Sequence, residues 1–194
     1  MNLEKLQAYF NNFLWLVLTC LLAPYFYLLI ALKKRRPMLA KILIIQSGKI
    51  GDLTCTTPIF RAVKNKFPDS FLSVLVIKRS RDVLKNNHRV DEIITLDDYP
   101  KIRDKFKLLS KLRKEKYDWA FSLMPGVFNN LIGFWSLIPD RAATTYRYSG
   151  EITNFFSLFN NHRLEYQRHS PIIKHYFNLL RPMGIEEFSQ KKEL

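Results

Sequence analysis

The sequence predicts an α/β fold in which a parallel, doubly wound sheet carries helices on both faces and a hydrophobic helix precedes it. Three observations lead to this prediction. Residues 13–32 carry no charge. From residue 41 onward, short apolar segments alternate with segments of helical periodicity, which is the pattern of a parallel sheet. No internal repeat or low-complexity segment interrupts the alternation. The boundary between the two parts is expected at Arg36–Pro37.

The composition points to one domain with anionic partners. The chain has 194 residues, which is enough for a domain with a hydrophobic core and an appendage. Its 31 Lys and Arg outnumber its 17 Asp and Glu, and a net charge of +14 favours an acidic membrane surface or a phosphorylated substrate. Nucleic acid is the other anionic class. The basic residues are scattered and no nucleic-acid-binding motif is present, so no nucleic-acid partner is expected.

The cysteines and histidines predict neither a disulfide framework nor a metal centre. Two cysteines in a chain of this size fit a reducing compartment. The four histidines lack the spacing of metal ligands, and no cluster of cysteines or carboxylates accompanies them. No metal and no cofactor are therefore expected.

The uncharged run 13–32 predicts a membrane anchor. About twenty apolar residues span the core of a bilayer as a helix. The basic cluster 33–36 follows at once, which places that end on the cytoplasmic side. Residues 1–36 are therefore expected to form an anchor helix with a basic flank in the inner (cytoplasmic) membrane, and the soluble domain is expected to face the cytoplasm.

Two other interpretations of this run stay open. A cleaved signal peptide normally carries its positive charge before the apolar run, whereas here the basic cluster comes after it. A re-entrant or interfacial helix is the second alternative. Pro24 motivates it, because proline interrupts the helical hydrogen-bond ladder in the middle of the run.

Five segments are predicted as strands of the sheet. The first, 41–46, is a continuous apolar run bounded by Ser47 and Gly48, which is typical of a strand buried on both faces. The others are short apolar or β-branched segments that follow at regular intervals. The predicted strands are 41–46, 71–77, 92–96, 118–123 and 142–146.

The segments between these strands predict helices. In 101–116, Ile102, Phe106, Leu109 and Leu112 recur at helical spacing, and the remaining positions are mostly basic. This basic helix face is expected either to meet acidic phosphates or the membrane, or simply to be solvated. The last helix is expected to end before Gly184, a residue typical of helix C-termini. The predicted helices are 58–67, 79–87, 101–116, 129–137 and 171–183.

The loop 47–52 after the first strand is the candidate binding site. In doubly wound sheets, ligands bind beyond the carboxyl ends of the strands. Two glycines allow a tight turn and close approach of the backbone, and free N–H groups at a helix N-terminus hold anions. The spacing matches neither the dinucleotide-binding fingerprint nor the P-loop. The candidate binding residues here are Ser47, Gly48, Lys49 and Gly51.

Asp52 closes this loop and has two interpretations. The structural interpretation is that Asp52 is the N-cap of the following helix, a position that aspartate favours. If instead Thr57 caps the helix and Pro58 is its first residue, proline takes a favourable position. Asp52 then lies in the loop, free to act on a ligand. The predicted helix 58–67 follows this second interpretation.

A series of motifs runs through residues 41–185 in a fixed order. The first strand is followed by a G-x-x-G-D loop, a run ending in proline, a helix, and F-P-D before the second strand. Segments 90–94 (V-D-E-I-I), 117–120 (Y-D-W-A), 138–141 (I-P-D-R) and 169–185 come later. This order resembles the family-9 glycosyltransferases, which include the lipopolysaccharide heptosyltransferases. The matching residues of the opening are Gly48, Gly51, Asp52, Thr57, Pro58, Phe67, Pro68 and Asp69.

The resemblance implies a fold and an activity. The family has the GT-B arrangement of two facing Rossmann-like halves, of which residues 37–185 would be the N-terminal, acceptor-side half. The reaction is an inverting sugar transfer to a glycolipid acceptor such as the lipopolysaccharide core. The residue matching the family's general base is Asp52. Lys49 would lie beside the acceptor or the leaving group, and Arg141 and His169 would line the cleft; a structural or solvated role is the alternative for each.

The sequence departs from the family in two respects. The anchor 13–32 is not part of the usual heptosyltransferase. Residues 186–194 are a polar tail, and the donor domain is expected to be absent from this chain. A nucleotide-sugar donor such as ADP-heptose would then be held by a C-terminal half that is missing here, and this chain alone would not be expected to catalyse transfer. The alternative function is a non-catalytic, membrane-bound module that binds glycolipid or acts as a scaffold.

Overall fold

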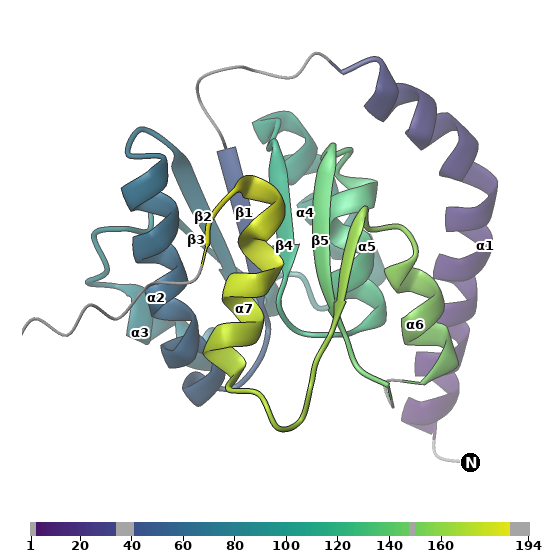
Figure 1. Cartoon of the computed structure of the whole chain (residues 1–194). Coiled ribbons are helices and arrows are strands. Elements are labelled where there is room, and N and C mark those ends of the chain that lie inside the picture. The colour runs from purple at the N-terminus through teal and green to yellow at the C-terminus, as the bar shows by residue number, and fades with distance from the viewer. Residues whose placement is uncertain (1–2, 34–40, 148–149, 187–194) are drawn as a thin grey trace, which may run out of the picture.

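The computed structural model describes residues 3–33, 41–147 and 150–186, which form one parallel sheet with helices around it (Figure 1). The sheet has six strands in the order β3-β2-β1-β4-β5-β6, and every neighbouring pair is parallel. The strand order reverses between β1 and β4, which is the topological switch point. The strands are β1 Lys41–Gln46, β2 Phe71–Val76, β3 Glu92–Thr95, β4 Trp119–Ser122, β5 Asp140–Thr145 and β6 His162–Glu165.

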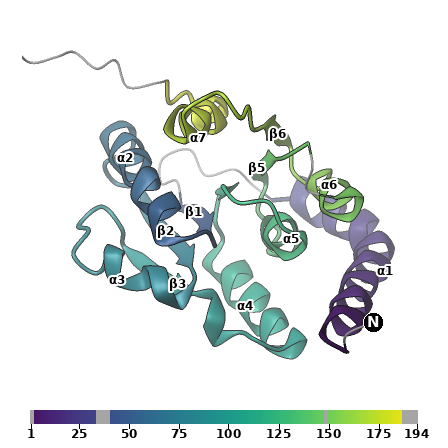
Figure 2. The same ribbon diagram turned by 90° about the horizontal axis from the view of Figure 1, so that it is seen from below.

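Helices cover both faces of the sheet, as predicted. Helices α2, α3 and α7 lie on one face, and α4 and α5 lie on the other, with α1 and α6 outside α5 (Figure 2). The α/β, Rossmann-like fold class is confirmed, including the long apolar helix at the start. The helices are α1 Leu3–Ala31, α2 Ile50–Lys66, α3 Arg81–Leu84, α4 Ile102–Glu115, α5 Val127–Trp135, α6 Glu151–Ser157 and α7 Ile172–Leu180.

Strand β1 lies at the centre of the molecule because its side chains are apolar on both faces. Ile42 and Ile44 pack in the core beneath α2 and α7. Leu43 and Ile45 point the other way, into the core beneath α4 and α5. All four are 0–1% exposed. A strand that is apolar at every position is stable only between two helical layers, and here it forms the centre of a two-sided core.

Two elements at the end of the sheet were not predicted. Strand β6 alternates half-buried and exposed residues and carries charges, because it pairs only with β5 at the edge of the sheet. Helix α6 is only 7 residues long and follows Gly150. A further difference concerns 79–87, where the predicted helix is reduced to a 3₁₀ turn, Lys78–Ser80, and the four residues of α3. Short or edge elements leave little periodicity in a sequence.

Helix α1 is continuous through Pro24 and packs against the domain. Trp15, Thr19 and Phe26 are its buried residues. The Trp15 ring lies 5.0 Å from that of Trp135 on α5, whose Nε1 donates a hydrogen bond of 3.0 Å to Thr19 Oγ1. A buried indole needs such an acceptor. The expected boundary at 36–37 lies outside the described residues, as do basic residues 34–36 and residues 187–194 of the tail.

Candidate functional site

The candidate site lies at the carboxyl ends of β1, β4, β5 and β6, on both sides of the switch point. After β1 the chain enters the loop 47–49, and after β4 it passes through residues 123–126 into α5. One side chain joins the two segments. Asn129 Nδ2 donates to Ser47 Oγ at 2.7 Å and to the Met124 carbonyl at 3.2 Å. The switch point is therefore closed by hydrogen bonds between its two sides.

The last residue of β1 fixes the start of the loop. Gln46 is fully buried, and its Nε2 donates to Thr56 Oγ1 at 2.9 Å and to the Tyr176 hydroxyl at 3.2 Å. Its Oε1 accepts the backbone N–H of Gly48 at 3.2 Å. One amide thus ties β1 to α2, α7 and the loop. A buried amide with these partners has a single orientation, because each alternative leaves a polar group unpaired.

Gly48 is required by the packing of the loop, and Gly51 is not. A Cβ atom at Gly48 would lie 2.8 Å from Asp52 Oδ2 and 3.0 Å from Gln46 Oε1. A Cβ atom at Gly51 would meet nothing within 4 Å. Both glycines were predicted as binding residues, and only Gly48 brings the backbone close to a polar side chain. Lys49 is exposed at the tip of the loop.

Asp52 lies in the first turn of α2, so its predicted place in an open loop is wrong. The helix begins at Ile50, and Asp52 Oδ2 accepts the backbone N–H of Lys49 at 3.1 Å. The N-cap is Lys49 rather than Asp52, which was the structural alternative; Asp52 is the third residue of the helix, and its carboxylate accepts the N–H of the N-cap residue. Among the described residues, no hydrogen bond reaches Asp52 Oδ1. The side chain is half-buried, and its Oδ2 is fixed by the bond from the N–H of Lys49.

The early start of α2 is possible because the helix compensates for its internal proline. Pro58 has no N–H and so cannot serve the carbonyl of residue 54, four positions earlier. Thr57 Oγ1 donates to that carbonyl at 2.9 Å. Since the freed carbonyl has a partner, Pro58 can lie inside the helix, and the predicted start at Pro58 was eight residues too late.

Two tyrosines lie within electrostatic reach of Asp52. Burial raises the pKa of Tyr176 to about 12, and the negative charge of Asp52 contributes to this shift. Burial also raises the pKa of Tyr146, with the charges of Tyr166 and Asp52 adding to it. Both phenols therefore stay protonated at neutral pH.

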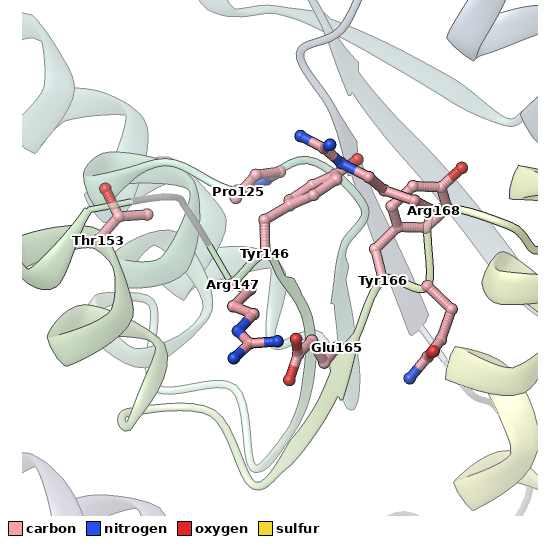
Figure 3. Close-up of a pocket in the computed structure, with 8 residues that line it drawn as sticks. Pro125, Tyr146, Arg147, Thr153, Glu165, Tyr166 and Arg168 are labelled. Carbon is pink, nitrogen blue, oxygen red and sulfur yellow. The ribbon is translucent and has the colours of Figure 1, made fainter.

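A pocket of about 500 Å³ opens beyond the ends of β5 and β6. Tyr146 and Tyr166 stand side by side in it, with ring centroids 5.1 Å apart, and Figure 3 shows Arg168 beside them. Arginines bind phosphate and carboxylate, and tyrosines offer both a ring face and a hydroxyl. The pocket is suited to a polar, anionic ligand. Its lining residues are Pro125, Tyr146, Arg147, Thr153, Glu165, Tyr166, Gln167 and Arg168.

This pocket was not predicted from the sequence, because part of its lining follows a strand that was not predicted. Tyr146 ends the predicted strand 142–146, and Arg147 follows it, so both could have been placed at the carboxyl edge of the sheet. Tyr166 and Arg168 could not, because the edge strand β6 before them was not predicted. His169, a predicted binding residue, is exposed in the turn before α7 and directly follows Arg168.

Arg141 lies at the amino end of β5, whereas the loop 47–52 follows the carboxyl end of β1. The structure therefore does not bring Arg141 to the loop. Arg141 is the second residue of β5 and 2% exposed. Its guanidinium donates to the carbonyls of Phe159, at 2.8 Å, and Pro139, at 2.9 Å, as well as to that of Ile138. Burial lowers the pKa of Arg141 to about 10. These bonds hold the segments around β5 together.

Comparison with known proteins places the chain near one group of enzymes. No family model matches it. It is 25% identical over 154 residues to "Lipopolysaccharide heptosyltransferase 2" of Escherichia coli, covering 77% of this chain and 42% of that protein. Its counterpart in Salmonella typhimurium is 28% identical over 104 residues, which cover 52% of this chain and 30% of the relative. The chain thus spans less than half the length of these relatives.

Solved structures have the same fold. The family-9 glycosyl transferase structure from Veillonella parvula matches with a TM-score of 0.66 at 17% identity, covering 82% of this chain and 46% of the other. Escherichia coli heptosyltransferase II matches with a TM-score of 0.59 at 23% identity, covering 72% and 39%. By sequence the chain is thus similar to lipopolysaccharide heptosyltransferases, and these solved structures show that it shares the fold of glycosyltransferase family 9 members.

Proposed function

We propose that this chain is the acceptor-side part of a heptosyltransferase-like glycosyltransferase that acts in lipopolysaccharide biosynthesis. The observation that carries the proposal is the position of Asp52 at the switch point. Oδ2 of this carboxylate accepts the N–H of Lys49, and among the described residues no hydrogen bond reaches Oδ1. A general base needs this combination of a fixed orientation and an open oxygen. The relationship to heptosyltransferases supports a sugar transfer as the reaction.

Asp52 would act on the acceptor hydroxyl. As the hydroxyl oxygen bonds to the anomeric carbon of the donor sugar, Asp52 takes its proton, and the bond from that carbon to the nucleoside diphosphate breaks with its electrons on the leaving oxygen. The positive charge that develops on the sugar is favoured by a nearby carboxylate. Structures of the heptosyltransferase WaaC are described with ADP and with ADP-2-deoxy-2-fluoro heptose. An ADP-linked heptose is accordingly the proposed donor.

The pocket beside Asp52 would hold the acceptor. Arg147 and Arg168 line it, and a phosphorylated glycolipid core offers the anionic groups that arginine binds in a fork geometry. Tyr146 and Tyr166 provide aromatic faces and hydroxyls for a sugar ring. The negative charge of Asp52 contributes to the raised pKa of Tyr146, which supports placing the base near this pocket. Lys49 and His169 are both exposed, and we propose that they contact the leaving group and the acceptor.

The variant Asp52→Asn tests the base. Asparagine keeps the shape of the side chain and its cap to the N–H of Lys49, but it cannot take a proton. We expect sugar transfer from ADP-heptose to a membrane glycolipid acceptor to fall about 10²–10⁴-fold. The assay uses membranes that contain the full chain together with the nucleotide-sugar-binding half of a relative.

Asp69→Asn is the matched control, because Asp69 is an exposed aspartate just beyond the same helix. Its activity should equal that of the wild type. Full activity of Asp52→Asn would refute the base. If the wild type retains glycolipid but transfers no sugar in any combination, the chain is a non-catalytic glycolipid-binding module instead.

A further inference from the structure

Helix α1 has two faces, and only one of them is covered. The covered face holds Trp15, Thr19 and Phe26, which pack on α4 and α5. The opposite face carries no charge from residue 6 to residue 32. Its side chains stand at helical spacing: Phe13, Val17, Leu21, Leu28 and Leu32 are all exposed, Leu21 and Leu32 by 71%. An apolar stripe of this extent marks a surface that binds something.

The covered face holds α1 against the domain from Trp15 onward. Near the middle of the helix, the Trp15 ring lies 5.1 Å from that of Phe106 and 5.5 Å from that of Phe128. At its end, Lys33 Nζ donates to the carbonyls of Tyr117, at 3.2 Å, and Leu137, at 3.3 Å. Figure 1 shows the helix running along the side of the domain that carries α5 and α6. The axis of α1 therefore runs parallel to the side of the domain.

A docked α1 cannot cross a bilayer without taking polar groups with it. Residues 6–31 span about 39 Å as a helix, which is more than a bilayer core. Cations of α4 lie beside this length: Arg113 sits 5.3 Å from the Phe26 ring, and Lys105 sits 4.8 Å from the Phe128 ring. Across the bilayer, these charges would enter hydrocarbon at a cost of several kcal/mol each. Along its surface, they would lie at the level of lipid headgroups.

Pro24 also favours the surface of the bilayer over its core. It is exposed on the uncovered face and has no N–H for the carbonyl of Cys20, which lies on the same face. In hydrocarbon a carbonyl without a donor costs several kcal/mol, whereas at the interface water can reach it. The helix thus tolerates a proline where its exposed face meets both lipid and water.

We propose that α1 lies in the plane of an anionic membrane surface, with its uncovered face among the lipid chains and its covered face still docked on the domain. The charge supports this occupant over a second copy of the chain. The basic residues 34–36 follow the stripe in the sequence, Lys105 and Arg113 lie beside the rings of Phe128 and Phe26 on the docked side of α1, and the net charge is +14. Two copies of such a surface would repel one another, whereas anionic lipids attract it. This inference does not depend on the sugar-transfer activity.

Adjacent residues on opposite faces of α1 provide the test. Cys20 is a native, exposed cysteine, and Thr19 beside it is buried against Trp135. The full chain is labelled with a fluorophore at Cys20 in a Cys55→Ser background, and at position 19 in a Thr19→Cys, Cys20→Ser, Cys55→Ser background. Further labels replace Phe13 and Leu28. Quenching by brominated lipids in vesicles of phosphatidylethanolamine and phosphatidylglycerol then measures the depth of each position.

We expect equal, shallow quenching at 13, 20 and 28, little quenching at 19, and weaker association with phosphatidylcholine vesicles. If the label at position 20 lies deepest in the bilayer and the label at position 19 is quenched as strongly, the proposal is overturned in favour of a spanning helix. No quenching at any position, together with a dimer in analytical ultracentrifugation, would overturn it in favour of a second copy. Circular dichroism confirms that each labelled variant is folded, and Lys107→Cys, exposed on α4, serves as a labelled position outside the stripe.

Discussion

At the scale of single residues, the site depends on a few buried polar groups whose partners leave no freedom. Gln46 joins β1 to two helices and the loop, and Gly48 packs against the carboxylate of Asp52. The role of Gln46 cannot be recognised from the sequence, because one of its partners, Tyr176, lies on α7, far along the chain. The role of Gly48 depends on how the side chains of Gln46 and Asp52 fold around it. The sequence could identify the glycines of the loop but could not distinguish which of them the packing requires.

The two glycines give a matched pair of variants. Gly48→Ala places a methyl group 2.8 Å from Asp52 Oδ2, so the cap of α2 must shift. We expect it to lower the free energy of unfolding by about 1–3 kcal/mol. Gly51→Ala meets nothing within 4 Å and lies in a helix, where alanine is favourable, so it should leave stability unchanged or raise it. Thermal denaturation of both variants measures this difference. Equal losses of stability would contradict the packing role of Gly48.

His175 makes stability depend on pH. Burial lowers its pKa from 6.5 to about 4, and its Nε2 lies 3.0 Å from Thr144 Oγ1. The folded protein therefore binds the proton less readily than the unfolded chain. This contribution to stability is present above pH 6.5 and is lost as the pH falls toward 4. His175→Asn should flatten the pH dependence of the denaturation midpoint in that range. An unchanged slope of the midpoint against pH would show that groups other than His175 cause the pH dependence.

At the scale of elements, α2 shows how a local rule was overridden. Proline favours the first turn of a helix, and the sequence accordingly predicted a start at Pro58. The structure begins the helix at Ile50 because Asp52 caps it and the Thr57 hydroxyl serves the carbonyl that Pro58 leaves free. A threonine directly before a proline was therefore the signal that could have revealed the longer helix.

Thr57→Val tests this compensation. It removes the hydroxyl while keeping the shape, and the carbonyl of Thr54 loses its donor. We expect the free energy of unfolding, measured by urea denaturation, to fall by about 1 kcal/mol. Thr54→Val is the control: its hydroxyl bonds the carbonyl of Ile50, which keeps the usual helical N–H, so the loss should be smaller. A larger loss for Thr54→Val would refute the role of Thr57.

The elements also show how far the sequence reached. The five strands with apolar runs were predicted within two residues of their bounds, because burial on both faces leaves a continuous signal. The edge strand β6 and the short α6 leave none, and the pocket between the ends of β5 and β6 was missed with them. Site residues on the loop after β1 could be predicted, while those on an edge strand required the fold.

At the scale of the whole molecule, α1 adds a further layer to the sheet and its helices. The sequence treated residues 1–36 as separate from the domain, because an apolar run gives no sign of which side it covers. The aromatic cluster around Trp15 instead continues the core beneath α4 and α5. The second layer of this domain is therefore completed by a helix that precedes it in the chain.

Two variants of α1 should separate stability from membrane binding. Trp15→Ala opens a cavity among Phe106, Phe128 and Trp135, and we expect it to cost about 3–5 kcal/mol of stability. Phe13→Ala lies two residues away on the uncovered face and should change stability little, while it weakens vesicle binding. Denaturation and vesicle flotation measure the two effects. Loss of stability by Phe13→Ala alone would contradict the assignment of the faces.

The docking of α1 also affects how the protein would meet a lipid-borne ligand. In the proposed arrangement, α1 lies in the bilayer surface and is fixed to the domain. It therefore sets the tilt of the domain and the height of the pocket above the lipid. Rotation about the membrane normal is then the only change of orientation left to the domain. The encounter then becomes a search in two dimensions. Its rate would follow the mole fraction of acceptor in the membrane rather than its bulk concentration, and dilution with inert lipid would slow it at constant total acceptor.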